Sequence, residues 1–212
     1  MGHDPEAIEM AAQFAAYMPP LARSDVAILE AAVAGGEDAR VRSAALGALI
    51  RGGGGPARAA WRISARDPDA AVRRRAGELA PSVVPAPGRG ILTLLTDSDA
   101  FVAETAAWAL GETEWTGPTR ARVVSALGRA AGEHPDPLVR ESAVAALGAI
   151  GDDRGLPAIL AACRDRPPIR RRAVLALAPF EGPEVGAALE AARADVDWQV
   201  RQAAEDLSES PD

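Results

Sequence analysis

A glutamate and a tryptophan stand four residues apart near the middle of the chain, in the stretch DAFVAETAAWALGETEWTG (99–117). Residues four apart share one face of an α-helix, so Glu104 and Trp108 would point the same way if this stretch is helical. A carboxylate beside an aromatic ring attracts cationic and polar groups. The pair therefore predicts a site for a small ligand or for an anchoring side chain of a partner protein.

A second tryptophan, Trp115, follows in the segment GETEWTGPT (111–119), together with Glu112 and Glu114. A tryptophan is rarely left in an exposed loop without a contact, so we expect Trp115 to cover the site formed by Glu104 and Trp108. Two plainer interpretations stay open. Trp108 could fill a gap in the packing, and the segment could be a longer loop on a tolerant surface.

The other residue types that could do chemistry form no recognisable site. Cys163 is the only cysteine, which excludes an internal disulfide and a cysteine metal cluster. Without a histidine partner we expect it to be a small buried apolar residue rather than a nucleophile. His3 and His134 are far apart in the sequence, and GGGG (52–55) lacks the GK[ST] of a phosphate loop. No metal or other cofactor is expected.

The charge of the chain limits its partners. The net charge of −7 and the pI of about 5.0 disfavour a general nucleic-acid surface, which needs a positive field, although a local basic patch remains compatible with them. No apolar run approaches the roughly 18 residues of a membrane span. The acidic start MGHDPEAIEM does not resemble a signal peptide. We therefore expect a soluble cytoplasmic protein that binds no membrane.

The stretch that carries Glu104 and Trp108 is one of six similar segments. Each contains an aspartate, then a valine or isoleucine usually followed by arginine, then alanine and leucine at helical spacing. The segments are 38–49, 69–79, 99–110, 136–147, 165–177 and 197–207, with anchors Val41, Val72, Val102, Val139, Ile169 and Val200. The steps between anchors are 31, 30, 37, 30 and 31 residues, and the long step follows the stretch 99–117. Such a period indicates a repeat array.

Each segment is preceded by an apolar helical stretch, so the expected unit is a helix A, a turn and a helix B. The aspartate before helix B is a good N-cap, and glycine-rich turns such as 52–56 and 150–155 end helix B. Because a single pair cannot bury its apolar face, the pairs must stack on one another. We therefore predict an all-α fold, a right-handed α-α superhelix (α-solenoid). Residues 1–212 would form one domain, with a capping helix at 4–18 and repeats at about 25–50, 56–80, 88–111, 117–150, 154–178 and 182–207.

The pattern D-x-x-V-R-x-x-A-x-x-A-L-G resembles HEAT repeats, in particular the short HEAT-like repeats of the phycobilin-lyase type. DPLVRESAVAALGAIGDDRGLPAIL (136–160) is the closest copy, and the resemblance covers about residues 25 to 207. It implies that the B helices line a concave surface. Such repeats occur in scaffolds, adaptors, lyase subunits and DNA glycosylases, so the resemblance implies a fold and leaves the function open.

The repeat register places further residues beside Glu104 and Trp108. Positions two and six residues after each anchor face the open side of helix B. On this basis Arg74 and Glu78 of the second unit, and Glu141 and Arg171 of the fourth and fifth, would be neighbours of the pair. The predicted ligand-binding set is Glu104, Trp108, Trp115, Arg74, Glu78, Glu141 and Arg171.

The arginines that follow the anchors have a structural interpretation. We expect Arg42, Arg73, Arg140, Arg170 and Arg201 to form a ladder with the aspartates at the helix starts, Asp38, Asp69, Asp136, Asp165 and Asp197. One rung is missing, because position 103 is alanine. The triplets 73–75 and 170–172 are expected on a solvated face, though they could also hold an anionic ligand or a nucleic-acid backbone.

The favoured hypothesis is a non-catalytic binding or scaffold module whose concave face holds a protein, a peptide or a small ligand. The first alternative is a HEAT-like DNA glycosylase, in which Glu104, Trp108 and Trp115 would surround a modified base while Arg74 and Arg171 met phosphates. The acidic net charge and the absence of lysine count against it. The second alternative is a chromophore lyase or accessory subunit, which rests on the repeat type and on Cys163.

Overall fold

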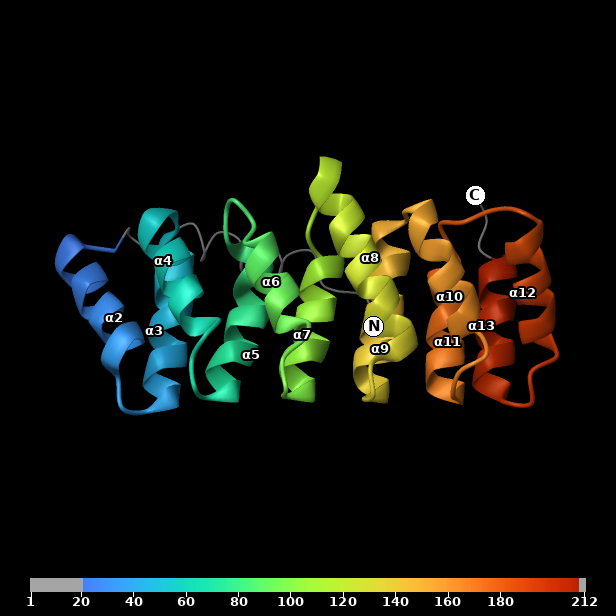
Figure 1. Ribbon diagram of the computed structural model, residues 1–212, viewed down its shortest axis with the longest axis horizontal. Coiled ribbons are helices and arrows are strands. Elements are labelled where there is room, and N and C mark those ends of the chain that lie inside the picture. The colour runs from blue at the N-terminus through green and yellow to red at the C-terminus, as the bar shows by residue number, and fades with distance from the viewer. Residues whose placement is uncertain (1–20, 210–212) are drawn as a thin grey trace, which may run out of the picture.

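The computed structural model describes residues 21–209, which form twelve α-helices in six stacked pairs (Figure 1). The A helices are α2 (Arg23–Gly35), α4 (Gly54–Ser64), α6 (Gly88–Leu94), α8 (Gly117–Glu133), α10 (Leu156–Ala162) and α12 (Pro183–Arg193). The B helices are α3 (Ala39–Gly52), α5 (Ala70–Leu79), α7 (Ala100–Gly111), α9 (Pro137–Ile150), α11 (Pro167–Ala176) and α13 (Trp198–Glu209). The prediction of an all-α solenoid is confirmed. The predicted capping helix 4–18 lies outside the described residues.

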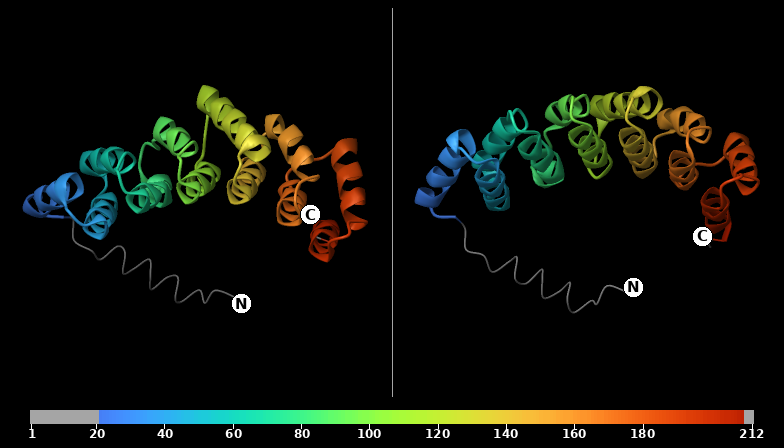
Figure 2. Two further views of the ribbon diagram at one scale, coloured as in Figure 1. Left: turned by 60° about the horizontal axis from the view of Figure 1, so that its bottom comes forward. Right: turned by 90° about the horizontal axis from the view of Figure 1, so that it is seen from below.

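The pairs follow an arc, with the A helices on its outer, convex side and the B helices on its inner, concave side (Figure 2). Each B helix packs against the next one, most extensively α7 against α9. The open side of the B helices is therefore the concave surface, which is where the predicted site residues on α5, α7, α9 and α11 belong.

Aspartates start the B helices, as their N-cap preference requires. The carboxylates of Asp38, Asp69, Asp99 and Asp136 accept the backbone N–H two residues further on, over 2.7 to 3.0 Å. The fifth B helix is different, because α11 has Arg166 at its N-cap and the Asp165 carboxylate accepts the Arg166 N–H instead.

The core is built from small aliphatic residues. The anchors Val72, Val102, Val139, Ile169 and Val200 are buried, whereas Val41 in the first pair is exposed. At two junctions the close packing of successive B helices depends on a glycine nine residues after the anchor. A Cβ at Gly111 would lie 2.9 Å from the Ala146 Cα, and one at Gly148 would lie 2.8 Å from the Ala176 Cα. Larger residues there would push the helices apart.

The long step of 37 residues lengthens a helix. Helix α8 has 17 residues, whereas the A helices on either side of it, α6 and α10, have 7 each. Its first turns project beyond the ends of the neighbouring helices (Figure 1). None of the helices within residues 21–209 combines the length and apolar character needed to cross a membrane.

Candidate functional site

Three side chains form a stripe along the concave face of α7. Phe101, Glu104 and Trp108 stand at positions i, i+3 and i+7, which lie on one helical face. Phe101 is exposed and Trp108 is 43% exposed, while Glu104 between them is half-buried. The Glu104 carboxylate makes no ion pair with any residue in the described range. The predicted Glu104–Trp108 pair is therefore extended by a second aromatic ring. The seven-residue spacing of Phe101 and Trp108 was the sequence signal for it.

Helix α5 provides the neighbours on one side of this stripe. The Arg74 guanidinium lies 3.3 Å from the Glu78 carboxylate, and Arg75 pairs with the same carboxylate over 2.8 Å. The guanidinium carbon of Arg74 also lies 6.0 Å from the centre of the Phe101 ring, at the outer limit of a cation–π contact. Arg74 and Glu78 thus adjoin the stripe, with their charges already balanced against each other.

Helices α9 and α11 flank the other side. Glu141 pairs over 3.5 Å with Arg172, while the exposed Arg171 has a different environment. Arg171 lines a shallow hollow of about 230 Å³ with Leu175 and Trp198, toward the C-terminal end of the array. Helix α9 packs directly on α7, whereas α11 packs on α9 and lies one helix further away. Glu141 on α9 is therefore nearer to the stripe than Arg171 on α11.

Trp115 belongs to the core, so the prediction that it covers the concave site is wrong. Its side chain is only 7% exposed, and its indole N–H donates to the Leu110 carbonyl over 2.7 Å. The ring packs against Gly88 at the start of α6, where a Cβ would lie 2.8 Å from it. The absence of a side chain at Gly88 makes the space that the indole fills, and this buries a ring whose loop position suggested exposure.

The arginine ladder exists, but most of its predicted acidic partners are wrong. The arginine after four of the six anchors pairs with an aspartate of the following repeat: Arg42 with Asp67, Arg73 with Asp97, Arg140 with Asp165 and Arg170 with Asp195, over 2.7 to 2.8 Å. We call each such pair a clasp. The fifth predicted arginine, Arg201 in the last repeat, donates to the carbonyls of Asp195 and Val196.

Three of the four clasped aspartates stand two residues before the N-cap aspartate and accept its backbone N–H. The carboxylate of the N-cap aspartate itself accepts the backbone N–H two residues further on.

Each clasp also ties the turn of its own repeat. The Nη1 atom of Arg73 donates to the carbonyls of Asp67 and Pro68, and the Nη1 atom of Arg140 donates to the carbonyls of His134 and Pro135. The hydrogen bonds from Arg73 hold the pKa of Asp97 below its usual value, and Arg140 and Arg170 do so for Asp165 and Asp195. The clasped carboxylates thus stay charged under all but acidic conditions.

The junction between the third and fourth repeats has neither partner of a clasp. Ala103 replaces the arginine and is fully buried, and His134 replaces the aspartate of the following repeat. The imidazole Nδ1 of His134 accepts the Asp136 N–H over 3.1 Å, as the Asp97 carboxylate accepts the Asp99 N–H over 2.9 Å. The turn is preserved while the link between repeats is lost. Sequence reasoning missed His134 because it assigned the clasp to the N-cap aspartates.

The two arginine triplets do not form a free basic surface. Arg73 and Arg170 are in clasps, Arg74 and Arg75 pair with Glu78, and Arg172 pairs with Glu141. Cys163 is half-buried, and burial raises the pKa of its thiol to about 11. At neutral pH this thiol is therefore protonated and a poor nucleophile.

Comparisons with known proteins agree with this architecture. A family model of HEAT repeats matches residues 88–178 and 124–208. YibA of Escherichia coli has a TM-score of 0.63 at 16% identity, over 90% of this chain and 71% of that one. A designed armadillo repeat protein in complex with the peptide (KR)4 has a TM-score of 0.59 at 17% identity, over 88% and 97%. An engineered protein has a TM-score of 0.57 at 19% identity, over 87% and 95%. No curated protein matches the sequence.

Proposed function

This chain belongs to the HEAT repeat family, and on that premise we propose that it is a non-catalytic binding module. Its concave face would hold an extended segment of a partner protein across α5, α7 and α9. The observation that carries the proposal is the stripe on α7, where an exposed Trp108 adjoins a Glu104 carboxylate with no ion-pair partner among residues 21–209.

The chemistry of the stripe favours a basic side chain as the anchor. A lysine or arginine can pair with the Glu104 carboxylate and lie over the Trp108 ring at the same time. The Glu78 and Glu141 carboxylates already have arginine partners, so Glu104 is the acidic group with the most to gain from a cation. A designed armadillo repeat protein of similar fold binds the basic peptide (KR)4, which supports a peptide as the kind of ligand.

Each catalytic alternative loses one of the features on which it rested. A base-binding pocket would have used Trp115, whose ring is buried against Gly88. A lyase would have used Cys163, whose thiol pKa is raised to about 11. Neither alternative gains an observation in its favour, and a binding module requires neither residue at the surface.

The test is direct binding of fluorescein-labelled (KR)4 peptide, measured by fluorescence anisotropy. We expect saturable binding that Trp108→Ala weakens about tenfold or more, since a central aromatic anchor dominates such interfaces. Glu104→Gln should weaken it as well, because it removes the charge and keeps the shape. The matched control is Trp198→Ala, which removes a more exposed tryptophan (64%) near the C-terminal end of the array. Unchanged affinity in both stripe variants would contradict the site.

A further inference from the structure

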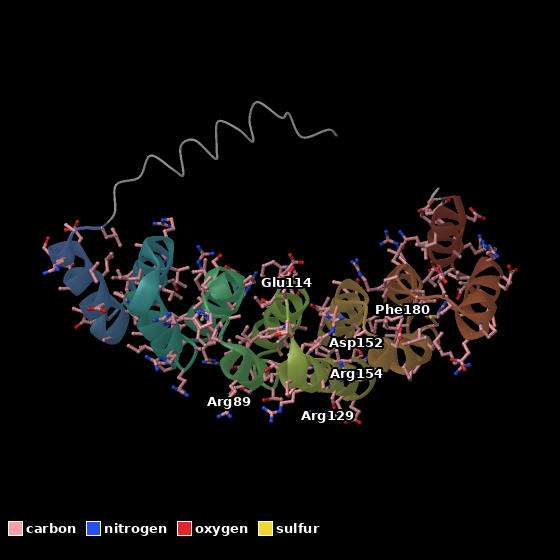
Figure 3. All side chains as sticks on the ribbon, turned by 90° about the horizontal axis from the view of Figure 1, so that it is seen from above. Arg89, Glu114, Arg129, Asp152, Arg154 and Phe180 are labelled. Atoms are coloured by element: carbon pink, nitrogen blue, oxygen red, sulfur yellow. The ribbon has the colours of Figure 1, made fainter. Side chains whose placement is uncertain are left out.

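The convex face carries arginines without acidic partners. Helix α4 and the turn after it supply Arg62 and Arg66, α6 supplies Arg89, and α8 supplies Arg122 and Arg129. All five are exposed, and none makes an ion pair with another residue in 21–209. Figure 3 shows Arg89 and Arg129 pointing away from the ribbon on the convex side. We call these five residues the outer arginine strip.

Few carboxylates lie near the strip. Helices α4 and α6 contain no aspartate or glutamate, and α8 contains only Glu133, its last residue. Asp67 and Asp97, in the turns that follow α4 and α6, are engaged in clasps with Arg42 and Arg73. A protein with a net charge of −7 therefore presents a positive surface here, and such a surface attracts anionic groups locally.

The strip borders two hollows with apolar floors, one on each side of α6. The first, of about 300 Å³, lies between α4 and α6, where Arg62, Arg66 and Arg89 surround Trp61, Pro87 and Gly90. The second, of about 720 Å³, lies between α6 and α8, where Arg122 and Arg129 stand beside Leu92, Leu95, Ala126 and Ala130. Thr96, Ser125, Glu133 and His134 complete the polar part of the second hollow.

A third hollow shows that the cationic lining is specific to this part of the array. It lies between α10 and α12 and measures about 710 Å³, nearly the same as the second. Its charged groups are Arg164 together with the carboxylates of Glu184 and Asp195. Stacked A helices thus leave hollows of similar size, but the two beside α6 hold two or three exposed arginines each, whereas the third holds one arginine and two carboxylates.

We propose that the outer arginine strip binds an acidic segment of a partner protein, with apolar side chains of that segment in the two hollows. The surface of a lipid bilayer could contact the arginines, but it could not reach into the hollows between the helices. A nucleic-acid backbone would leave the apolar floors unused, and the net charge of −7 would oppose it at longer range. Acidic and apolar side chains on one flexible chain satisfy both features.

The spacing of the hollows sets the pattern of the ligand. Neighbouring packed helices lie about 8–10 Å apart, and a chain in the polyproline II conformation advances about 3.1 Å per residue with three residues per turn, so that side chains three positions apart lie on one side of it. Apolar residues three positions apart would therefore reach the two hollows, with carboxylates between them facing the arginines. The peptide EELEELEE has this pattern, and EEGEEGEE and QQLQQLQQ remove its apolar and its acidic part separately.

The experiment measures binding of these fluorescein-labelled peptides to the full chain by anisotropy. We expect EELEELEE to bind at least tenfold more tightly than either control peptide, with a strong loss of affinity as salt rises. The triple variant R62Q/R89Q/R122Q should lose at least tenfold. The control R23Q/R51Q/R164Q changes the net charge equally, using exposed arginines outside the strip, and should lose less than twofold. Ala126→Glu, which places a carboxylate in the second hollow, should also weaken binding.

Several results would overturn the proposal. Equal losses in the two triple variants would mean that only net charge matters. Tighter binding of a DNA duplex, or of phosphatidylglycerol vesicles, than of EELEELEE would assign the strip to another partner. An equal loss of EELEELEE binding in Trp108→Ala would place the peptide on the concave face. Circular dichroism melting of each variant separates lost binding from lost folding.

Discussion

The junction between the second and third repeats and the junction between the third and fourth are held together in different ways. At the first, Arg73 clasps Asp97 and ties its own turn through two carbonyls. At the second, the clasp positions hold Ala103 and His134, and α7 meets α9 through the close contact of Gly111 with Ala146. A hydrogen bond from the Ser142 hydroxyl to the Glu104 carbonyl, over 3.0 Å, crosses the same junction. Close helix packing and this hydrogen bond therefore hold a junction that has no clasp.

This difference lies beside the proposed concave site. Glu104 and Trp108 belong to α7, the B helix on the N-terminal side of the unclasped junction. Position 103 next to Glu104 is alanine, and the Glu104 carboxylate makes no ion pair with any residue in 21–209. The deviations of the third repeat therefore combine a changed junction, a carboxylate free for a ligand and two exposed aromatic rings.

The largest expected effect comes from Trp115, which takes part in the packing at the unclasped junction. Replacing it by alanine should lower the free energy of unfolding by about 3–5 kcal/mol, because a large buried ring and its hydrogen bond are lost. Urea unfolding followed by circular dichroism measures this loss. The control, Trp108→Ala, should cost clearly less, about 1–2 kcal/mol, because only part of this ring is buried. Similar losses in the two variants would contradict the assignment of Trp115 to the core and Trp108 to the surface.

The second effect concerns the clasped junction. Arg73→Met keeps much of the aliphatic stem and removes the guanidinium, leaving Asp97 and the turn carbonyls without their donor. We expect a loss of about 2 kcal/mol in the same urea measurement, because partly buried charged groups lose their partners. Arg74→Met removes a more exposed arginine one position away and should cost at most about 1 kcal/mol. If Arg74→Met costs as much, the clasp has no special role.

The fold was predictable from the sequence because the residues that define the repeat pattern are the buried residues of the core. Anchors such as Val102 and Val139, with alanine and leucine at helical spacing, specify one buried stripe per B helix. The N-cap aspartates Asp69 and Asp99 mark where these helices begin. Local rules of helix capping and amphipathicity are sufficient for such features, since each depends on residues only a few positions apart.

The site was predictable only where it follows from the face of one helix. Glu104 and Trp108 share a face by their spacing alone, whereas the position of Trp115 depends on the space left by Gly88, 27 residues earlier. The clasp partners were assigned wrongly for a similar reason. Asp67 and Asp69 are both near a turn, and only the path of the chain shows which one faces Arg42. Contacts between repeats are not encoded in local spacing.

The third effect tests whether the unclasped junction can accept a clasp. Ala103→Arg alone should destabilise the protein, because it places a charge at a fully buried position opposite His134. Combined with His134→Asp it should recover part of that loss, giving a favourable coupling of about 1–2 kcal/mol in a double-mutant cycle. Urea unfolding of the four proteins measures it. If the effects of the two substitutions on stability are additive, the two side chains do not interact, and this junction cannot form a clasp.

The smallest effect is in the pH dependence of stability. Hydrogen bonds from Arg73 hold the pKa of Asp97 below its usual value in the folded protein. The stabilisation is therefore fully present above the ordinary carboxyl pKa of about 4 and is lost as the pH falls through the lowered folded pKa. Each clasped aspartate adds a slope of at most about 1.4 kcal/mol per pH unit in that window. Urea midpoints measured from pH 7 to pH 2.5 report the sum of these slopes.

Two variants change this slope in opposite directions. Asp97→Asn removes one clasped carboxylate, so it should be less stable than the wild type at pH 7 and converge with it as the pH falls through the lowered pKa of Asp97. The double variant A103R/H134D should show a steeper loss below pH 4, because a working clasp at the third junction brings a further aspartate with a lowered pKa. An unchanged slope in the double variant, together with a favourable coupling at pH 7, would mean that its stability comes from packing. The unclasped junction would then tolerate an arginine without forming an ion pair.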